Sequence, residues 1–286
     1  MPEAEVNGVR LYYELHGSGE PLALVHGAWV DATAWRFVVP GLAQNFRVLS
    51  YDRRGHSRSE RPATQGSFDE DGGDLAALLE ALDLAPAHVV TNSGGGNIAL
   101  RLATRRPDVF RSLSCHEPAL WGLLEQDPEC REILQQGARS LEAVGRRIAQ
   151  GDHEGAARQF VEEVAFGPGA WDNELPPESR AIFVHNAPTA LDELQGPSPF
   201  DIQEEAISRL EMPVGLTNGS ESPPVFPRVI DRLMELILWV TRETIEGAAH
   251  APQLTTPERY VEVTTRGVRS RGSARRRRLA GRPGPQ

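Results

Sequence analysis

The sequence predicts an α/β fold in which a mainly parallel sheet carries helices on both faces and a helical cap is inserted. Short β-branched and apolar runs alternate with helical periods along most of the chain, and this alternation stops between residues 118 and 210. The chain has 286 residues, of which 40% are hydrophobic. This is enough for one large domain, or for a core with an inserted subdomain.

The strands are expected where four to eight residues are apolar or β-branched and are bounded by turn residues. In chain order they are residues 9–15, 21–26, 46–52, 87–93, 110–117, 213–219 and 238–245. Three core helices are expected at residues 74–82, 97–106 and 257–268, the last of which opens with Thr256-Pro257.

The interval 118–210 contains helical pieces, such as residues 129–148 and 154–164, joined by links rich in glycine and proline. We interpret it as a helical cap inserted between the two parts of the core, residues 1–117 and 211–265.

The basic residues are all arginine, and the absence of lysine excludes Schiff-base catalysis, a P-loop and a Ser-Lys dyad. The formal net charge is −10, but residues 266–286 carry eight arginines and no acid, leaving −18 for the rest. We therefore expect no nucleic-acid partner for the body of the chain. Residues 266–286, rich in Gly, Pro and Arg, are expected to form a disordered tail.

The N-terminus is acidic, and no run approaches the roughly 20 apolar residues that span a bilayer. We expect a cytoplasmic protein without a membrane partner, a monomer or homodimer that acts on a small molecule. Cys115 and Cys130 are too few for a disulfide framework and are expected to be reduced. No cofactor is expected, and no metal, because the histidines lack ligand spacing.

The strongest chemical signal is Thr91-Asn92-Ser93-Gly94-Gly95-Gly96, where a strand end runs directly into a helix. A nucleophilic serine on such a turn is strained and exposed, and needs small residues two positions away on either side. Gly95 meets this need, whereas Thr91 departs from the Gly-x-Ser-x-Gly pattern. A glycine-rich helix start with an incidental serine remains the alternative.

A second interpretation uses the same residues, since Gly94-Gly95-Gly96-Asn97-Ile98-Ala99 fits the dinucleotide fingerprint after a strand. Glu117 lies about 20 residues on, where a ribose-binding acid belongs. This would make the chain a dinucleotide-binding oxidoreductase. However, the match follows several earlier strands, and it leaves motifs at both ends of the chain unexplained.

Those motifs are residues 26–29 (His-Gly-Ala-Trp), after an expected strand, and residues 247–252 (Gly-Ala-Ala-His-Ala-Pro), after the last one. Residues 51–59 (Tyr-Asp-Arg-Arg-Gly-His-Ser-Arg-Ser) lie between them. In this order and spacing the chain resembles the α/β-hydrolase family over residues 5–265.

The resemblance implies a catalytic Ser93, His250 as its base, and an oxyanion hole made by the backbone N–H groups of Ala28 and Gly94. The chemistry agrees, because a serine hydroxyl becomes a good nucleophile when an imidazole takes its proton and a carboxylate holds that imidazole. His26 is expected to satisfy the loop backbone instead.

The acid has two candidates. The commonest family pattern places an aspartate in a Gly-x-x-Asp-Pro turn, but here that position holds Ser222, with Glu221 one residue short. We favour Glu117, which ends the strand after the nucleophile helix, as in the zearalenone lactonase-like branch that the chain resembles. Pro118 predicts an extended backbone at Glu117.

A serine nucleophile suits acyl transfer, so a carboxylic ester or lactone is the expected substrate, and Trp29 and Trp121 are expected to contact it. C–C bond hydrolases, amidases, thioesterases and haloperoxidase-like enzymes stay open as alternatives. The aromatic side chains of the expected cap are candidates for a substrate pocket or for core: Trp121, Phe160, Phe166, Trp171, Phe183 and Phe200.

Overall fold

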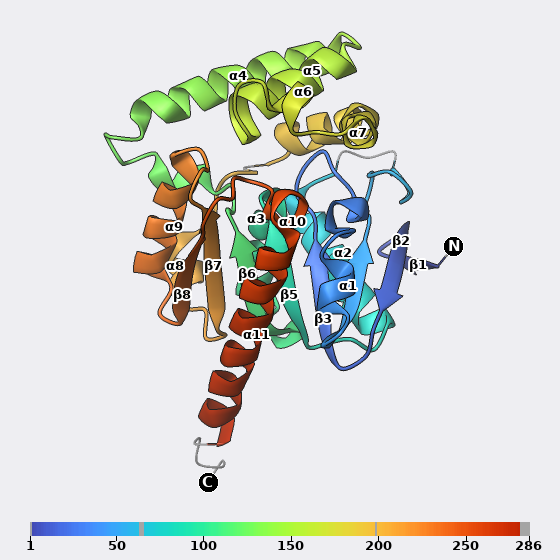
Figure 1. The fold of residues 1–286 in the computed structure, drawn as a ribbon, viewed down its shortest axis with the longest axis vertical. Coiled ribbons are helices and arrows are strands. Elements are labelled where there is room, and N and C mark those ends of the chain that lie inside the picture. Colours follow the sequence, from blue (N-terminus) through green and yellow to red (C-terminus); the bar gives the residue numbers. More distant parts are fainter. Residues whose placement is uncertain (1, 63–65, 198, 281–286) are drawn as a thin grey trace.

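The sheet at the centre of the molecule has eight strands in the order β1-β2-β4-β3-β5-β6-β7-β8 (Figure 1). The computed structural model describes residues 2–62, 66–197 and 199–280, with side chains as far as residue 270. β2 pairs antiparallel with both β1 and β4, and the other neighbours are parallel. The strands are β1 (Glu3–Val6), β2 (Val9–His16), β3 (Glu20–Val25), β4 (Phe46–Tyr51), β5 (Ala87–Asn92), β6 (Phe110–His116), β7 (Val214–Gly219) and β8 (Val240–Ile245).

Each of the predicted strands is present within two residues of its expected ends, and β1 is the strand that the sequence analysis missed. β1 joins β2 through Asn7 and Gly8, which both have positive φ angles, of 49° and 77°. An Asn-Gly pair is a strong hairpin signal, so this motif was the clue to the missing strand.

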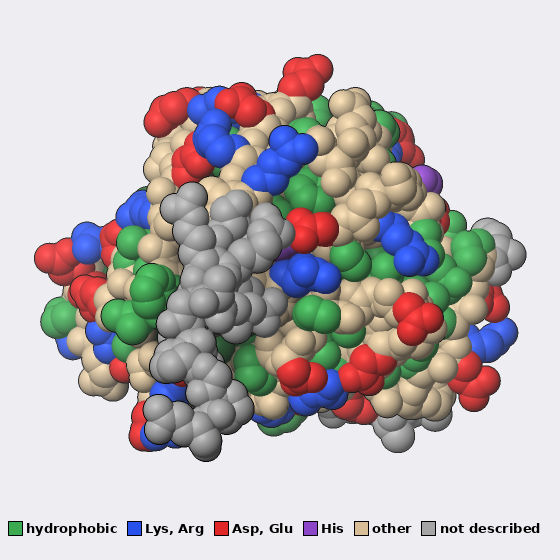
Figure 2. Space-filling model, turned by 90° about the horizontal axis from the view of Figure 1, so that it is seen from below, with side chains coloured by type: hydrophobic (Ala, Val, Ile, Leu, Met, Phe, Trp, Pro, Cys, Tyr) green, Lys and Arg blue, Asp and Glu red, His purple; other side chains and the backbone are tan. Residues whose placement is uncertain are grey.

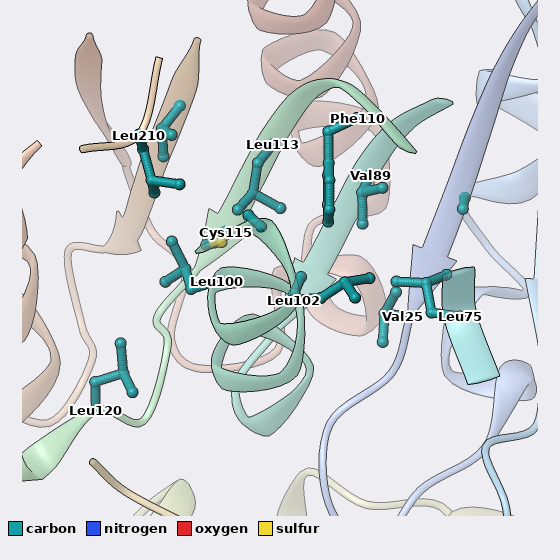
Figure 3. Close-up of a cluster of buried hydrophobic side chains, with 14 of the residues drawn as sticks. Val25, Leu75, Val89, Leu100, Leu102, Phe110, Leu113, Cys115, Leu120 and Leu210 are labelled. Atoms are coloured by element: carbon teal, nitrogen blue, oxygen red, sulfur yellow. The ribbon is translucent and has the colours of Figure 1, made fainter. Parts of the chain in front are cut away.

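The sheet is covered on both faces, and alternate residues of each central strand point to opposite faces. In β3, Ala23 and Val25 belong to one hydrophobic cluster, and Leu22 and Leu24 to another. The first cluster contains residues of α2 (Phe68–Ala81), α3 (Gly94–Arg105) and α9 (Val225–Leu236), and the second contains residues of η1 (Ala32–Trp35), α1 (Val39–Leu42) and α11 (Pro257–Ala280). Figure 3 shows part of the first cluster, around α3 and β6.

The interval between β6 and β7 holds most of the remaining helices. Of these, α4 to α7 form a layer above the ends of the strands (Figure 1). α8 lies lower, packed against α3 and α9, so this last helix belongs with the core layers. The elements are η3 (Trp121–Leu124), α4 (Arg131–Ala149), α5 (His153–Phe160), a π-helical turn (Val161–Ala165), α6 (Ala170–Asn173), α7 (Pro177–Gln195) and α8 (Glu204–Ser208). Two short elements lie outside this interval: η2 (Pro107–Val109) and α10 (Pro252–Thr255).

The C-terminal helix differs from the predicted tail, because α11 continues past residue 266 as far as Ala280. Tyr260, Thr264 and Val268 recur every four residues and are all buried, so they place one face of the helix on the core. Arg266 forms ion pairs with Glu243 and Glu262. The tail boundary at residue 266 is therefore corrected; residues 281–286 lie outside the described residues.

Acidic and basic side chains are intermixed on the face opposite α4 to α7, as Figure 2 shows. The negative net charge is thus not gathered into a single patch on this face. Within the described ranges, no helix has both the length and the apolar character that crossing a membrane requires. Cys115 and Cys130 are both buried, and no disulfide joins them.

Candidate active site

Ser93 occupies a strained turn between β5 and α3, with φ of 54° and ψ of −128°. Its N–H donates to the His116 carbonyl at 2.9 Å, and its own carbonyl accepts from the Gly96 N–H at 2.8 Å. A side chain at Gly95 would place Cβ 2.4 Å from the Val25 carbonyl oxygen, so only glycine fits there. This is the conformation that exposes a serine hydroxyl at a strand end.

The departure at Thr91 is accommodated by the third glycine of the run. Thr91 is fully buried, and its Oγ1 lies 3.3 Å from the position that a Cβ on Gly96 would take. The turn therefore tolerates Thr91, which is larger than the glycine of the usual pattern, because Gly96 on the other side of Ser93 has no side chain.

His250, in the loop after β8, forms a hydrogen bond from Nδ1 to Glu117 Oε2 at 2.7 Å. Its ring stacks on Phe226, with ring centroids 4.2 Å apart. Its backbone carbonyl accepts from the Asn92 side-chain amide at 2.9 Å. The ring, the backbone and the tautomer of His250 are thus all held, since the carboxylate favours the proton on Nδ1 and leaves Nε2 unprotonated.

Glu117 is completely buried at the end of β6, where its second oxygen, Oε1, accepts from the Gly219 N–H at 2.8 Å. Burial alone raises the pKa of this carboxyl, but the neighbouring His116 and the hydrogen bond from His250 outweigh it and lower the pKa to about 2. Glu117 is therefore ionised at neutral pH, as a group that stabilises an imidazolium must be.

The backbone of Glu117 is not extended, so the conformation predicted from Pro118 is wrong. Its φ is 47°, in the left-handed region. The Glu117 N–H bonds to the Thr217 carbonyl at 3.0 Å, and the side chain bonds to Gly219 and His250. These contacts with β7 and with the last loop outweigh the local preference of a residue before proline.

The two acid candidates lie in different environments. Glu221 is exposed at the surface, and its N–H bonds to the Ala248 carbonyl at 2.9 Å as part of a turn. The structure therefore brings Glu117, and not Glu221, to His250. Ser222, at the position where aspartate was expected, lowers the pKa of Glu117 by less than His116 and His250 do.

The two backbone N–H groups expected to form an oxyanion hole lie beside Ser93. A Cβ on Gly94 would be 3.5 Å from the Ala28 nitrogen, and one on Gly27 would be 3.1 Å from Ser93 Cβ. Among the described residues, neither N–H donates a hydrogen bond to another protein group. Within the described ranges, both N–H groups are therefore available to a ligand atom beside Ser93.

A cavity of about 50 Å³ joins these groups, since Ser93, Gly94, Ala28 and His250 all line it. Trp29 and Trp121 line it as well, so the structure places both predicted contact residues at the cavity. The other aromatic residues between β6 and β7 take three kinds of position. Phe160 and Phe200 line the cavity, and Phe166 meets the His250 ring edge-on. Trp171 and Phe183 lie in the hydrophobic cluster of the helical layer.

A buried charge cluster behind the cavity was not predicted. Arg53 is completely buried, 2.9 Å from Asp71 of α2 and 2.6 Å from Glu193 of α7, and Glu193 also lines the cavity. His26 accepts from the Arg53 N–H at 3.0 Å, which agrees with a role in satisfying the loop. The sequence carried no signal for this cluster, because it depends on how α7 docks.

His116 and Asn92 were also missed. His116 lies beside Glu117, with Nε2 3.7 Å from Oε1, and burial lowers its pKa to about 4. Both residues flank predicted positions, His116 before Glu117 and Asn92 before Ser93. Adjacency in sequence was therefore the available signal.

The dinucleotide interpretation conflicts with this geometry, because the residue that would hold the ribose is already engaged. Glu117 is buried, with its two oxygens bonded to His250 and Gly219. Across the described ranges, His, Cys, Asp and Glu side chains do not gather in groups of three or more that could hold a metal ion.

The family of the chain is shown by comparison with known proteins. The family model of the alpha/beta hydrolase fold matches residues 20–257. The chain belongs to the alpha/beta hydrolase fold family. This confirms the predicted fold class and the family resemblance, and it places the chain among hydrolases.

Individual relatives have different activities. A RutD protein of Azorhizobium caulinodans, whose name gives carbamate hydrolysis as a provisional assignment, is 38% identical over 269 residues, covering 92% of this chain and 96% of that protein. An acetoin cleaving system component of Pseudomonas putida, a dihydrolipoyllysine-residue acetyltransferase, is 29% identical over 254 residues, and the match covers 87% of this chain but 59% of that relative. The solved structure of Est816, described as an N-acyl homoserine lactone degrading enzyme, is 25% identical with a TM-score of 0.72, covering 92% of this chain and 99% of that one.

Proposed function

We propose that this protein is a serine hydrolase that cleaves a carboxylic ester or a lactone through an acyl-enzyme. The observation that carries the proposal is the hydrogen bond of 2.7 Å between His250 and an ionised, buried Glu117, at a cavity that Ser93 also lines. A nucleophile, a base and a carboxylate that orients the base are the three parts that such a reaction needs.

In the proposed mechanism, Ser93 Oγ attacks the substrate carbonyl while His250 Nε2 takes the hydroxyl proton. Glu117 stabilises the imidazolium that forms. The N–H groups of Ala28 and Gly94 bind the oxyanion, and each such donor is worth about 3–4 kcal/mol where one has been removed from an enzyme.

Collapse of the intermediate breaks the bond to the alcohol oxygen, which takes the proton from His250. Water then attacks the acyl-enzyme, with His250 again as base, and releases the acid and Ser93. With a lactone, the alcohol stays attached to the acyl group throughout. Similarity to Est816 supports the lactone branch of this proposal.

The substrate class follows from the nucleophile and the wall of the cavity. Hydrolases that open epoxides or remove halides on this fold use a carboxylate as nucleophile, whereas a serine forms acyl-enzymes from carbonyl compounds. Trp29, Trp121, Phe160 and Phe200 make the wall largely apolar, which favours a substrate with an apolar body.

Labelling with a fluorophosphonate probe followed by peptide mapping tests this proposal. We expect a covalent adduct on Ser93 in the wild-type protein and none in folded Ser93→Ala. The adduct should also slow when His250 is replaced by alanine. An unlabelled Ser93 in the folded wild-type protein, or an adduct mapped to another serine, would overturn the proposal.

A further inference from the structure

The wall of the cavity contains two buried hydrogen-bond acceptors that the proposed reaction does not use. Glu193 is 6% exposed, and its Oε2 has no hydrogen-bond partner among the described residues. Asn97 is completely buried, and its Oδ1 likewise has no partner in the described part of the chain. Buried acceptors of this kind are costly unless a donor meets them, so each one points to a donor that the described residues do not supply.

The orientation of both groups is fixed by contacts on their other atoms. The Asn97 side-chain nitrogen donates to the carbonyls of Ala119 and Pro199, both at 3.0 Å, and this leaves Oδ1 as the acceptor. Glu193 Oε1 lies 2.6 Å from Arg53 Nη2. Both side chains are thus held as acceptors before any ligand arrives, which lowers the entropy cost of binding one.

The charge around Glu193 also favours a donor. Arg53 is the cation for both Asp71 and Glu193, and the three side chains are 0%, 4% and 6% exposed. His26 and His56 lie beside Arg53, and burial together with this guanidinium lowers the pKa of both rings, so neither adds positive charge at neutral pH. The cluster therefore has two carboxyl groups for one guanidinium, and burial raises the pKa of both carboxyls, so a further hydrogen-bond donor at Glu193 would stabilise its ionised form.

A third unused group lines the same cavity. The Trp121 indole N–H is buried and has no acceptor among the described residues. The residues that line the cavity thus carry two acceptors and one donor without partners in the described ranges. A secondary amide would supply one N–H to these acceptors and one carbonyl oxygen to the Trp121 N–H.

We propose that Glu193 and Asn97 form a polar subsite that selects esters or lactones carrying an amide N–H, with Trp121 available to the amide carbonyl. The inference rests on the proposed function, because the amide is recognised while Ser93 attacks a separate ester carbonyl. Ser93, Asn97 and Glu193 line one cavity, so an ester held at Ser93 can present its amide to both side chains.

Two pairs of esters, each differing only by N–H against CH₂, test this subsite. On the acyl side the pair is p-nitrophenyl N-acetylglycinate and p-nitrophenyl 4-oxopentanoate. On the alcohol side it is 2-acetamidoethyl butyrate and 4-oxopentyl butyrate. The measurement is the ratio of kcat/KM within each pair, compared between wild type and variants, so that intrinsic reactivity cancels.

In the wild type we expect at least one ratio to favour the N–H ester, by about 10- to 100-fold relative to the same ratio in Glu193→Met. Glu193→Gln should lie between the two, because its amide oxygen still accepts but carries no charge. Arg53 retains Asp71 as counter-ion in both variants, so folding is expected to be preserved, and thermal unfolding checks it. Glu178→Met is the matched control, since Glu178 lies on the same helix with its side chain 67% exposed.

The outcomes separate the two proposals. If the wild type hydrolyses these esters through Ser93 but the ratios are unchanged in folded Glu193→Met and Glu193→Gln, the subsite is overturned and the hydrolase stands. That result would indicate a bound water as the partner of Glu193, in the neighbouring cavity of about 10 Å³ that Asp71 and Thr189 also line. If the wild type hydrolyses none of the four esters, the proposed function fails, and the subsite with it.

Discussion

Glu193 lines the cavity and Glu117 lies behind His250, and the surroundings of these two buried glutamates are opposite. Glu117 receives hydrogen bonds from His250 and from the Gly219 N–H, and its pKa is lowered to about 2. Glu193 shares one guanidinium with Asp71, its Oε2 has no hydrogen-bond partner among the described residues, and burial raises its pKa. Burial alone therefore does not decide the state of a carboxyl; the number of donors around it does.

The difference also has a functional meaning. Glu117 is satisfied within the protein and is suited to hold one partner, His250, in one orientation. Glu193 is incompletely satisfied and is suited to receive a partner from outside. The first test of this contrast concerns Ser93, the proposed nucleophile: Glu117 would act on it through His250, and Glu193 would bind the substrate that it attacks.

Ser93→Ala should remove the nucleophile while leaving the turn intact, because the strain is in the backbone and alanine adds no atom. We expect ester turnover to fall by about 10⁴- to 10⁶-fold with an unchanged melting temperature or a slightly higher one. Steady-state rates on purified protein, together with thermal unfolding, measure both. Wild-type rates in this variant would contradict the proposed mechanism.

Glu117→Gln should separate the orienting glutamate from every other acid of the site. The amide oxygen can still accept from Gly219, but the amide nitrogen then faces His250 Nδ1, which favours the wrong tautomer and removes the stabilising charge. We expect turnover to fall by about 10³- to 10⁴-fold.

Glu221→Gln is the matched control, and it should cost little, because Glu221 is exposed at the surface. If the two results were exchanged, Glu221 would be the acid. Circular dichroism and thermal unfolding of both variants check that a loss of rate is not a loss of fold.

The surroundings of Glu117 could be predicted from the sequence better than those of Glu193. Ser93, Glu117 and His250 follow β5, β6 and β8, and parallel strands end at one edge of the sheet, so three strand ends in the chain become neighbours in space. The apolar and β-branched runs were sufficient to find these strands, and the motifs at the strand ends, together with the family resemblance, indicated the site residues.

The part above the sheet could not be predicted in the same way, because its position depends on tertiary contacts of α7. Asn186 donates to the Trp29 carbonyl at 3.1 Å, Thr189 to the Gly55 carbonyl at 2.5 Å, and Glu193 pairs with Arg53. These three residues lie on one face of α7, at spacings of three and four. In the sequence the same stripe reads as an ordinary polar helix face.

Arg53→Met should show how much the stability of the buried charge cluster of Arg53, Asp71 and Glu193 depends on its single cation. The change leaves Asp71 and Glu193 buried without a counter-ion, and it also removes the bond from Arg53 Nη2 to the Gly27 carbonyl at 3.1 Å. We expect a loss of about 3–5 kcal/mol in the free energy of unfolding, measured by urea denaturation at pH 8. Arg61→Met is the control, because Arg61 is half-exposed and pairs with Asp192 at the surface. An equal loss of unfolding free energy from both substitutions would show that the buried charge cluster contributes no more to stability than a surface ion pair.

The smallest expected effect is on the pH dependence of stability, where Glu117 and Asp71 should act in opposite directions. Glu117 has a folded pKa below its unfolded value, so its stabilisation is present above about pH 4.5 and is lost as the pH falls toward 2. Burial raises the pKa of Asp71 to about 7, so its contribution is present below about pH 3.8 and is lost as the pH rises toward 7.

Asp71→Asn cannot titrate and keeps Arg53 paired with Glu193. From pH 4 to pH 7 the melting temperature of the wild type should therefore fall relative to that of Asp71→Asn, by about 2–8 °C. Asp69→Asn, on the same helix, is the control, because its ion pairs with Arg101 and Arg105 lower its pKa and leave nothing to titrate in this range. Parallel melting curves for wild type and Asp71→Asn would mean that the excess carboxylate is compensated by a group other than Arg53.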